Sequence, residues 1–147
     1  MRRSRPRSAE QGSAVIEFVF LGILLMIPLV YLVLMLGRLQ AGAYAVSAAV
    51  RESGRAFVTA ENEDSAHARA QAAATLAMEN LGFGDASSLR IICSSSPCLT
   101  PGAEVRSEAE VRVPLPLIPE FAHAVVPLEM PLRAENLSRV DPFRALP

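Results

Sequence analysis

The sequence predicts an α+β protein: a long N-terminal transmembrane helix continuing as a stalk, then a second short helix and a small antiparallel sheet that form a head. Three observations support this fold class. Residues 18–36 form an uncharged apolar run, helical periodicity continues beyond that run, and apolar and polar residues alternate towards the C-terminus. We therefore divide the 147 residues into a basic leader (1–12), a transmembrane helix and stalk (13–60), and an exported α+β head (61–147).

Residues 18–36 read FVFLGILLMIPLVYLVLML and carry no charged or amide side chain. Their length matches the roughly 20 residues that a helix needs to cross a bilayer. Only a helix satisfies its own backbone hydrogen bonds within one membrane-spanning segment, so this run should be helical, with a bend at Pro28. The alternative, a core helix of a soluble protein, fits less well because the remaining chain is too small and polar to cover it.

The charges that flank this run predict its orientation. The four arginines of the leader are opposed by Glu10 alone, and only Arg38 follows closely behind the run. The positive-inside rule then predicts a single-pass protein of the inner (cytoplasmic) membrane, with its N-terminus in the cytoplasm and its C-terminal head outside. A cleaved secretory signal peptide is the alternative, but its apolar region usually has about 7–15 residues and precedes a small-residue site that is not evident here.

Helical periodicity continues through the stalk. Apolar residues recur there at spacings of three, four or seven: Leu39, Ala43, Val46, Val50 and Phe57. Gly42 and Gly54 weaken this helix. Residues 61–84 predict the second helix, with Asp64 or Ser65 as its cap and Gly82 in the left-handed conformation at its end. Its expected apolar face comprises Ala68, Ala72, Leu76 and Leu81, with Ala73 and Met78 nearby.

Strand patterns follow Gly84. Residues 89–93 (LRIIC) are short and apolar, and residues 104–113 alternate with the period of two of a half-buried strand. In that second strand the face expected to be buried holds Val105, Ser107, Ala109, Val111 and Val113. Residues 128–140 (LEMPLRAENLSRV) alternate again, and Pro131 should confine that strand to an edge or a bulge. The proline-rich connection 114–127 is expected to pack on the sheet or on another subunit.

Cys93 and Cys98 enclose the sequence SSSP. In an exported domain, two cysteines this close predict a disulfide that closes a small loop after the first strand. The alternative, half of a C-x4-C metal site, needs two further ligands that the chain does not offer. His67 is expected to be solvated, and with His123 as the only other histidine we expect no metal site and no cofactor.

The sequence contains none of the motifs that would indicate catalysis. There is no G-x-S-x-G, no H-E-x-x-H and no phosphate-binding glycine loop, so we do not expect this protein to be an enzyme. The formal net charge of −1 gives no general basic surface, and we expect no nucleic-acid partner.

Residues Gly12 to Phe18 (GSAVIEF) resemble the processing motif of type IV prepilins of the Flp/Tad class, which has a basic leader, a glycine, four residues, and then a glutamate and an aromatic. The whole chain resembles the TadE-like minor pilins (pseudopilins) of tight-adherence pilus systems. That resemblance includes the motif at the start of a single span, the helical stalk, and a small head that ends near VDPFR.

The resemblance implies cleavage between Gly12 and Ser13 by a membrane prepilin peptidase. Ser13 would become the new N-terminus, and Glu17 would pair with the terminal amine of a neighbouring subunit; Phe18 is the motif aromatic. The implied function is structural, a minor subunit in pilus assembly. The implied partners are the peptidase, other pilin or pseudopilin subunits, the Tad secretion and assembly machinery, and the lipid bilayer. Loss of four arginines and Glu10 would change the net charge from −1 to −4.

Two alternatives remain open. Glu17 can be simply a favourable acid in the first turn of a helix, where the helix dipole is positive. The second alternative is that the protein is an uncleaved single-pass membrane protein whose head acts as a binding or scaffold module of the cell envelope.

Overall fold

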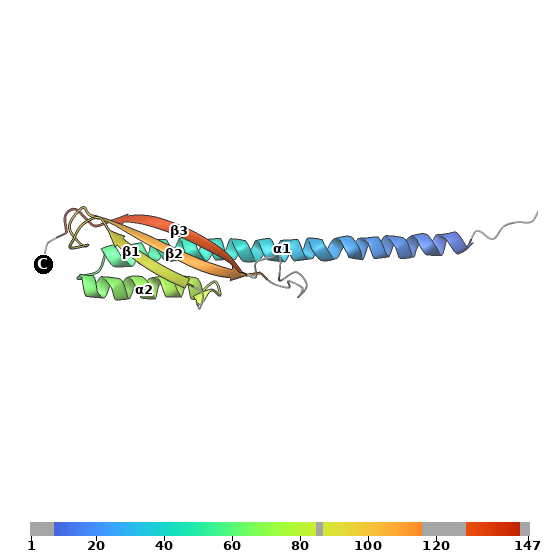
Figure 1. The fold of residues 1–147 in the computed structure, drawn as a ribbon, viewed down its shortest axis with the longest axis horizontal. Helices are drawn as coiled ribbons and strands as arrows, with labels where there is room; N and C mark the ends of the chain where they lie inside the picture. Colours follow the sequence, from blue (N-terminus) through green and yellow to red (C-terminus); the bar gives the residue numbers. More distant parts are fainter. Residues whose placement is uncertain (1–7, 85–86, 116–128, 145–147) are drawn as a thin grey trace, which may run out of the picture. The chain divides into compact units, whose positions relative to one another are not determined.

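The structure, a computed structural model, describes residues 8–84, 87–115 and 129–144, with side chains from Ala14 onward in the first helix and from Ser88 onward in the first strand. Its elements are α1 (Ser8–Val58), α2 (Glu63–Glu79), β1 (Ser87–Cys93), β2 (Glu104–Pro114) and β3 (Glu129–Arg139), traced in Figure 1. This arrangement confirms the predicted α+β class. The chain forms two compact units, Met1–Leu36 and Gly37–Pro147, and we call the second unit the head.

α1 is one continuous helix that begins before the expected Ser13 and ends at Val58. In the head, Val46, Val50 and Phe57 are buried as predicted, whereas Ala43 is exposed. The buried side of α1 instead includes Ala45 and Ala49, because these residues fall on the 3.6-residue stripe that contains the valines. The part of α1 that we expected to be a stalk in water thus contributes to the core of the head.

The N-cap of α2 lies two to three residues before the predicted caps, Asp64 and Ser65. Asn62 is the N-cap, and its side chain accepts a hydrogen bond from the Ser65 N–H at 2.9 Å. The Ser65 hydroxyl accepts one in return from the Asn62 N–H at 3.4 Å, which completes a capping box. Asp64 therefore lies in the first turn, where its charge complements the helix dipole. Gly82 has a φ of +78°, the left-handed conformation predicted for it.

The predicted apolar face of α2 is wrong. The buried residues are Ala66, Ala70, Ala74 and Met78. Ala68 and Ala72 are exposed, and Leu76 and Leu81 are 60% and 40% exposed. Alanines occur on both sides of this helix, so periodicity alone does not distinguish them. The contacts of α2 with α1 and the sheet select which side is buried.

The three strands form one antiparallel sheet in the order β1-β2-β3. In the register, Leu89 pairs with Ala109, and Ala109 pairs with Ala134. All five β2 residues predicted to face the core are buried. Of the residues described, β3 forms an edge of the sheet and contains Pro131, as predicted. The connection 116–128, which includes His123, lies outside the described residues.

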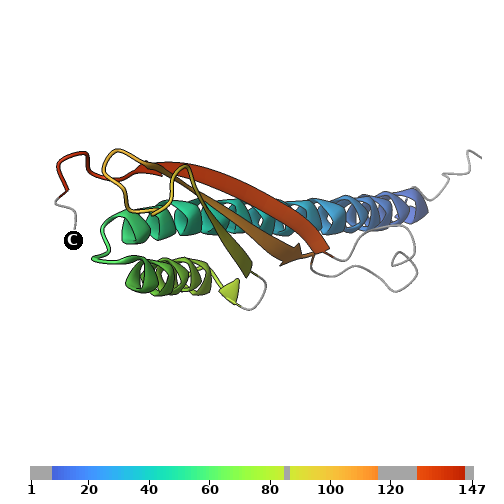
Figure 2. The same ribbon diagram turned by 60° about the vertical axis from the view of Figure 1, so that its left-hand side comes forward.

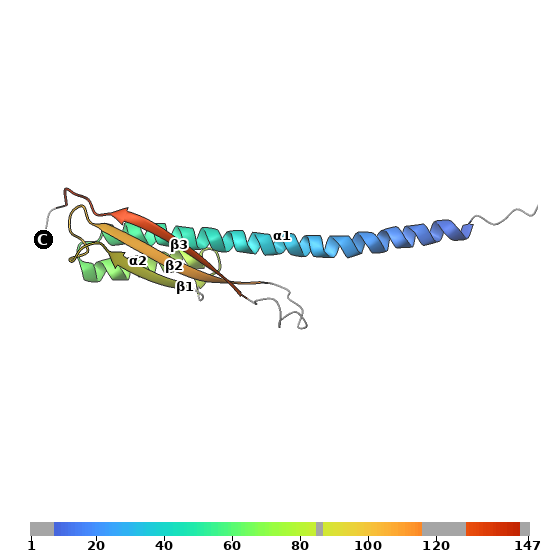
Figure 3. The same ribbon diagram turned by 45° about the horizontal axis from the view of Figure 1, so that its top comes forward.

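Both helices of the head cover the same face of the sheet, as Figures 2 and 3 show. One apolar cluster joins Val46 and Val50 of α1 with Met78 and with Val111 and Val113 of β2. A second cluster contains Phe57, Ala66, Ala70, Val105 and Val140. The opposite face of the sheet, which we call the open face, carries mostly charged side chains.

Candidate functional site

The two residues of the expected cleavage site, Gly12 and Ser13, lie within α1, since the helix begins at Ser8. A peptidase that binds an extended backbone would have to unwind the first turns of this helix. Gly12 lowers that cost, because a glycine destabilises a helix interior by about 0.5–1 kcal/mol relative to alanine. The site is therefore near a helix end and next to a residue that weakens the helix.

Glu17 follows Ser13 by four residues in α1, and Phe18 comes next. Helical spacing places Ser13 and Glu17 on the same side of the helix. Glu17 is exposed and Phe18 is 77% exposed. Among the described side chains, none forms an ion pair or hydrogen bond with the Glu17 carboxylate. Within the part of the chain whose side chains are described, the structure thus presents an acid without an ion-pair partner directly before a long uncharged surface.

The surface of α1 that follows Glu17 is apolar and is not covered by other described residues. Most large apolar side chains between Val15 and Leu36 are exposed, from 49% at Leu32 to 77% at Phe18, and Tyr31 and Met35 are half-buried. The segment Ala14–Val58 contains a stretch that is long and apolar enough to cross a membrane, and none of that stretch is buried in the protein. A buried helix of a soluble core would be covered by other residues, and no described residue covers this one. One helix that could span a membrane is what the structure supports.

The residues directly after the apolar run belong to the head. The Arg38 guanidinium lies over the Phe83 ring, with its central carbon 5.1 Å from the ring centroid, a cation–π contact. Leu39 packs against the first apolar cluster. At Gly42 an added Cβ would lie 2.4 Å from Cγ2 of Val113, so α1 and β2 approach closely. The contact with Phe83 could not be predicted from local patterns, because the two partners lie far apart in the chain.

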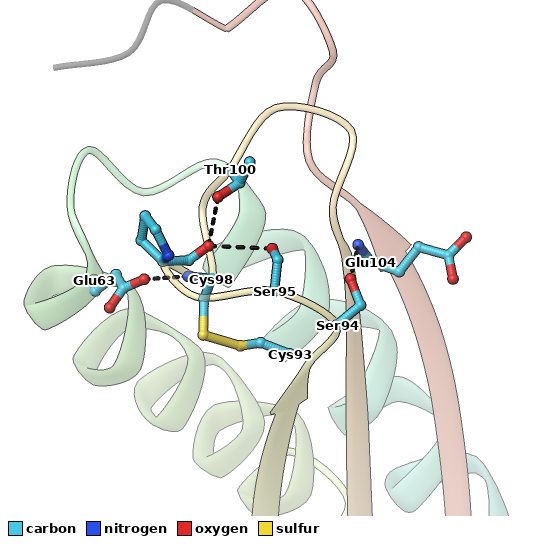
Figure 4. Close-up of a disulfide and its surroundings, with 8 residues drawn as sticks. Glu63, Cys93, Ser94, Ser95, Cys98, Thr100 and Glu104 are labelled. Carbon is cyan, nitrogen blue, oxygen red and sulfur yellow. Dashed lines mark hydrogen bonds between the residues drawn. A yellow bond between two sulfur atoms is a disulfide. The ribbon is translucent and has the colours of Figure 1, made fainter.

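The second predicted feature, the Cys93–Cys98 pair, forms a disulfide in this structure, with the Cα atoms 5.3 Å apart (Figure 4). The loop that it closes follows β1. The Ser94 hydroxyl accepts a hydrogen bond from the Glu104 N–H at 2.9 Å, which ties the loop to the start of β2. The Cys98 N–H donates to the Glu63 carboxylate in the first turn of α2. The loop is thus attached to three elements, and its role is structural.

The open face of the sheet is a surface of paired charges. Ion pairs join Arg133 to Glu110 at 2.7 Å and Arg139 to Glu104 at 2.6 Å. A depression of about 640 Å³ lies over the middle of this face, and its lining includes arginines and glutamates of all three strands. Opposite charges at adjacent strand positions stabilise a sheet modestly, and they explain this surface without a ligand.

The remaining polar groups do not form a reactive cluster in the described parts of the chain. No three histidine, cysteine, aspartate or glutamate side chains there are arranged to hold a metal ion. The His67 ring lies edge-on to Phe57, with the ring centroids 5.0 Å apart, and His67 is exposed.

The hydrogen bonds of Arg144 were not predicted from the sequence. The Arg144 guanidinium donates hydrogen bonds to the backbone carbonyls of Val58, Ala60 and Glu61, where α1 ends. Val58 is the last residue of α1, and Ala60 and Glu61 lie in the connection to α2, so the arginine caps the end of α1 and holds the connection that follows it. The partners are more than 80 residues apart in sequence, and no local pattern joins them.

Comparison with protein-family models, with characterised proteins and with solved structures finds no match to this chain. The function must therefore be argued from the chemistry of its own residues.

Proposed function

We propose that this protein is a structural and assembly subunit, a prepilin-like minor subunit of a Tad-type pilus that a prepilin peptidase cleaves after Gly12. Its N-terminus lies in the cytoplasm before cleavage, the apolar part of α1 crosses the cytoplasmic membrane, and the head lies outside. The observation that carries the proposal is Glu17, a carboxylate that has no ion-pair partner among the described side chains, directly precedes the uncharged run and follows Ser13 by about one helical turn.

An unpaired carboxylate at the edge of a hydrocarbon layer is unfavourable, so acids at such places usually have a partner or a function. Cleavage after Gly12 would create a positive amine on Ser13. An amine of a neighbouring copy can neutralise Glu17 where water is scarce, and the penalty for leaving the acid alone then favours association in one register. The exposed apolar side chains of α1 supply the surface that would pack against other pilin helices.

The cleavage step is tested by changing the residue before the scissile bond. In cells with a prepilin peptidase, Gly12→Leu should leave the full-length chain in the membrane, because the larger side chain obstructs binding in the peptidase cleft. Gly22→Leu is the matched control, since nothing lies within 4 Å of the position where its Cβ would be. It should be cleaved like the wild type. Equal cleavage of the Gly12→Leu variant and the wild type would contradict the proposal.

The assembly step is tested at Glu17. The Glu17→Ala variant should insert and be cleaved normally but be strongly depleted from pili sheared off the cells, because the new Ser13 amine loses its partner. Glu52→Ala removes another exposed glutamate of α1, in the head, and should not deplete the subunit. If Glu17→Ala reaches the pilus fraction in normal amount, the role assigned to this carboxylate is wrong.

A second candidate, an uncleaved membrane-anchored scaffold of the envelope, is favoured by one observation. Gly12 and Ser13 are helical here, which is not the backbone conformation that peptidases bind. In that case Glu17 serves only the positive end of the helix dipole, and Gly12→Leu would change nothing.

A further inference from the structure

The link between the apolar run and the head is very short. Arg38 follows Leu36, the last residue of the run, by two positions. A chain advances at most about 3.6 Å per residue, so the Arg38 backbone lies within about 7 Å of the end of the run. Each headgroup layer of a bilayer is about 5–8 Å thick, given a hydrocarbon core of about 30 Å in a total of 40–45 Å. If residues 18–36 span the membrane, chain length alone therefore keeps Arg38 in or beside the headgroup layer.

Arg38 brings one particular part of the head with it. Its guanidinium lies over Phe83, and the ring of Phe83 is also next to Gly42, 3.6 Å from the position of an added Cβ. Phe83 itself is only 3% exposed. The turn that holds this ring, residues 80–84 between α2 and β1, therefore lies beside Arg38, on the part of the head that directly follows the run.

Backbone hydrogen bonds fix the conformation of this turn, and the turn exposes the apolar side chain of Leu81. The N–H groups of Leu81 and Phe83 both donate to the Met78 carbonyl, at 3.1 and 3.0 Å. The Gly82 N–H donates to the Glu79 carbonyl at 2.9 Å. Leu81 is 40% exposed, although Leu is the type of residue that usually packs inward.

We propose that the turn 80–84 rests on phospholipid headgroups, with Leu81 entering the headgroup layer. The Arg38 guanidinium, on the face turned away from Phe83, binds a lipid phosphate. An arginine has five N–H donors, and its planar group can stack on a ring and bind phosphate at the same time. The partner is a phospholipid surface, and the proposal rests on the membrane span of the proposed function. The head would then be held against the bilayer before assembly, with its far end free for other subunits.

The position of the turn can be measured in the full chain reconstituted into phosphatidylcholine vesicles. Both native cysteines form the disulfide, so an introduced cysteine is the only free thiol. Leu81→Cys carries an environment-sensitive fluorophore, and lipids with a headgroup nitroxide act as quenchers. Phe143→Cys is the matched head control: Phe143 is 93% exposed and adjoins Arg144, which binds Val58. Val58 lies about 30 Å along α1 from Arg38 at 1.5 Å per residue. Leu24→Cys reports on the span.

We expect lipids with a headgroup nitroxide to quench the fluorophore several-fold more strongly at Leu81 than at Phe143. Lipids with the nitroxide on the acyl chain should quench the fluorophore at Leu24. Quenching at Leu24 with equally weak quenching at Leu81 and Phe143 would overturn the lipid contact and leave the membrane span intact. No quenching at Leu24 would overturn the span, and the lipid contact with it. Asn80→Cys, at an exposed position of the same turn, gives the same readout if the Leu81 variant does not fold.

Discussion

Gly42 lies where α1 packs against the sheet. A Cβ at this position would be 2.4 Å from Cγ2 of Val113 and 3.2 Å from Cδ1 of Leu132. Val113 is fully buried and branched at Cβ, so it has few alternative rotamers. Helix propensity alone predicts that Gly42 weakens the helix, because propensity is a local property and the neighbouring strand lies about 70 residues further along the chain. In the structure the same glycine permits the close contact.

We predict that Gly42→Ala destabilises the head by about 1–3 kcal/mol, the usual range for overpacking a core. This loss should exceed the gain of up to about 1 kcal/mol that alanine brings to a helix. Gly37→Ala is the control, because nothing lies within 4 Å of the Cβ position there. It should be neutral or slightly stabilising. Thermal unfolding in detergent measures both variants, and equal melting temperatures would refute the packing role of Gly42.

The helices and strands differ in how much of them the sequence predicts. The alternation in β2 identifies its buried face correctly, because a period of two leaves only two choices and the charges mark one of them. The apolar face of α2 was misplaced, because alanine fits both sides of that helix and only the neighbouring α1 and sheet select between them. For the candidate site, the GSAVIEF stretch is visible in the sequence, whereas the contact of Arg38 with Phe83 depends on the tertiary fold.

At the loop between β1 and β2, the disulfide spans a sequence separation of five. The chain-entropy model assigns about 2 kcal/mol to a loop this small. We expect the Cys93→Ser/Cys98→Ser double variant to lose about that much unfolding free energy. Reduction of the wild type with dithiothreitol should produce the same loss. A double variant as stable as the oxidised wild type would show that the disulfide contributes nothing.

The end of α1 depends on Arg144. Hydrogen bonds to a charged group contribute about 1.5–3 kcal/mol, so Arg144→Ala should lower the unfolding free energy by about that amount. Arg112→Ala is the control: its side chain is 65% exposed and its only described ion pair, to Glu110, is 3.9 Å long. It should lose less than about 0.5 kcal/mol. Denaturant unfolding followed by circular dichroism distinguishes the two, and equal losses would contradict the capping role.

For the whole molecule, the central question is how the N-terminal motif is used. The head has its own apolar clusters, disulfide and helix cap. Among the described side chains the Glu17 carboxylate has no ion-pair partner, and an acid beside an apolar surface is unfavourable without one. Under the proposed function, cleavage and assembly would supply that partner from a neighbouring subunit.

The most direct test is the N-terminus of the protein extracted from membranes of cells that contain an active prepilin peptidase. Intact-mass measurement with N-terminal sequencing reads it without any variant. Our account predicts a chain that begins at Ser13 and lacks residues 1–12. A chain that still begins at Met1 in those cells would contradict it.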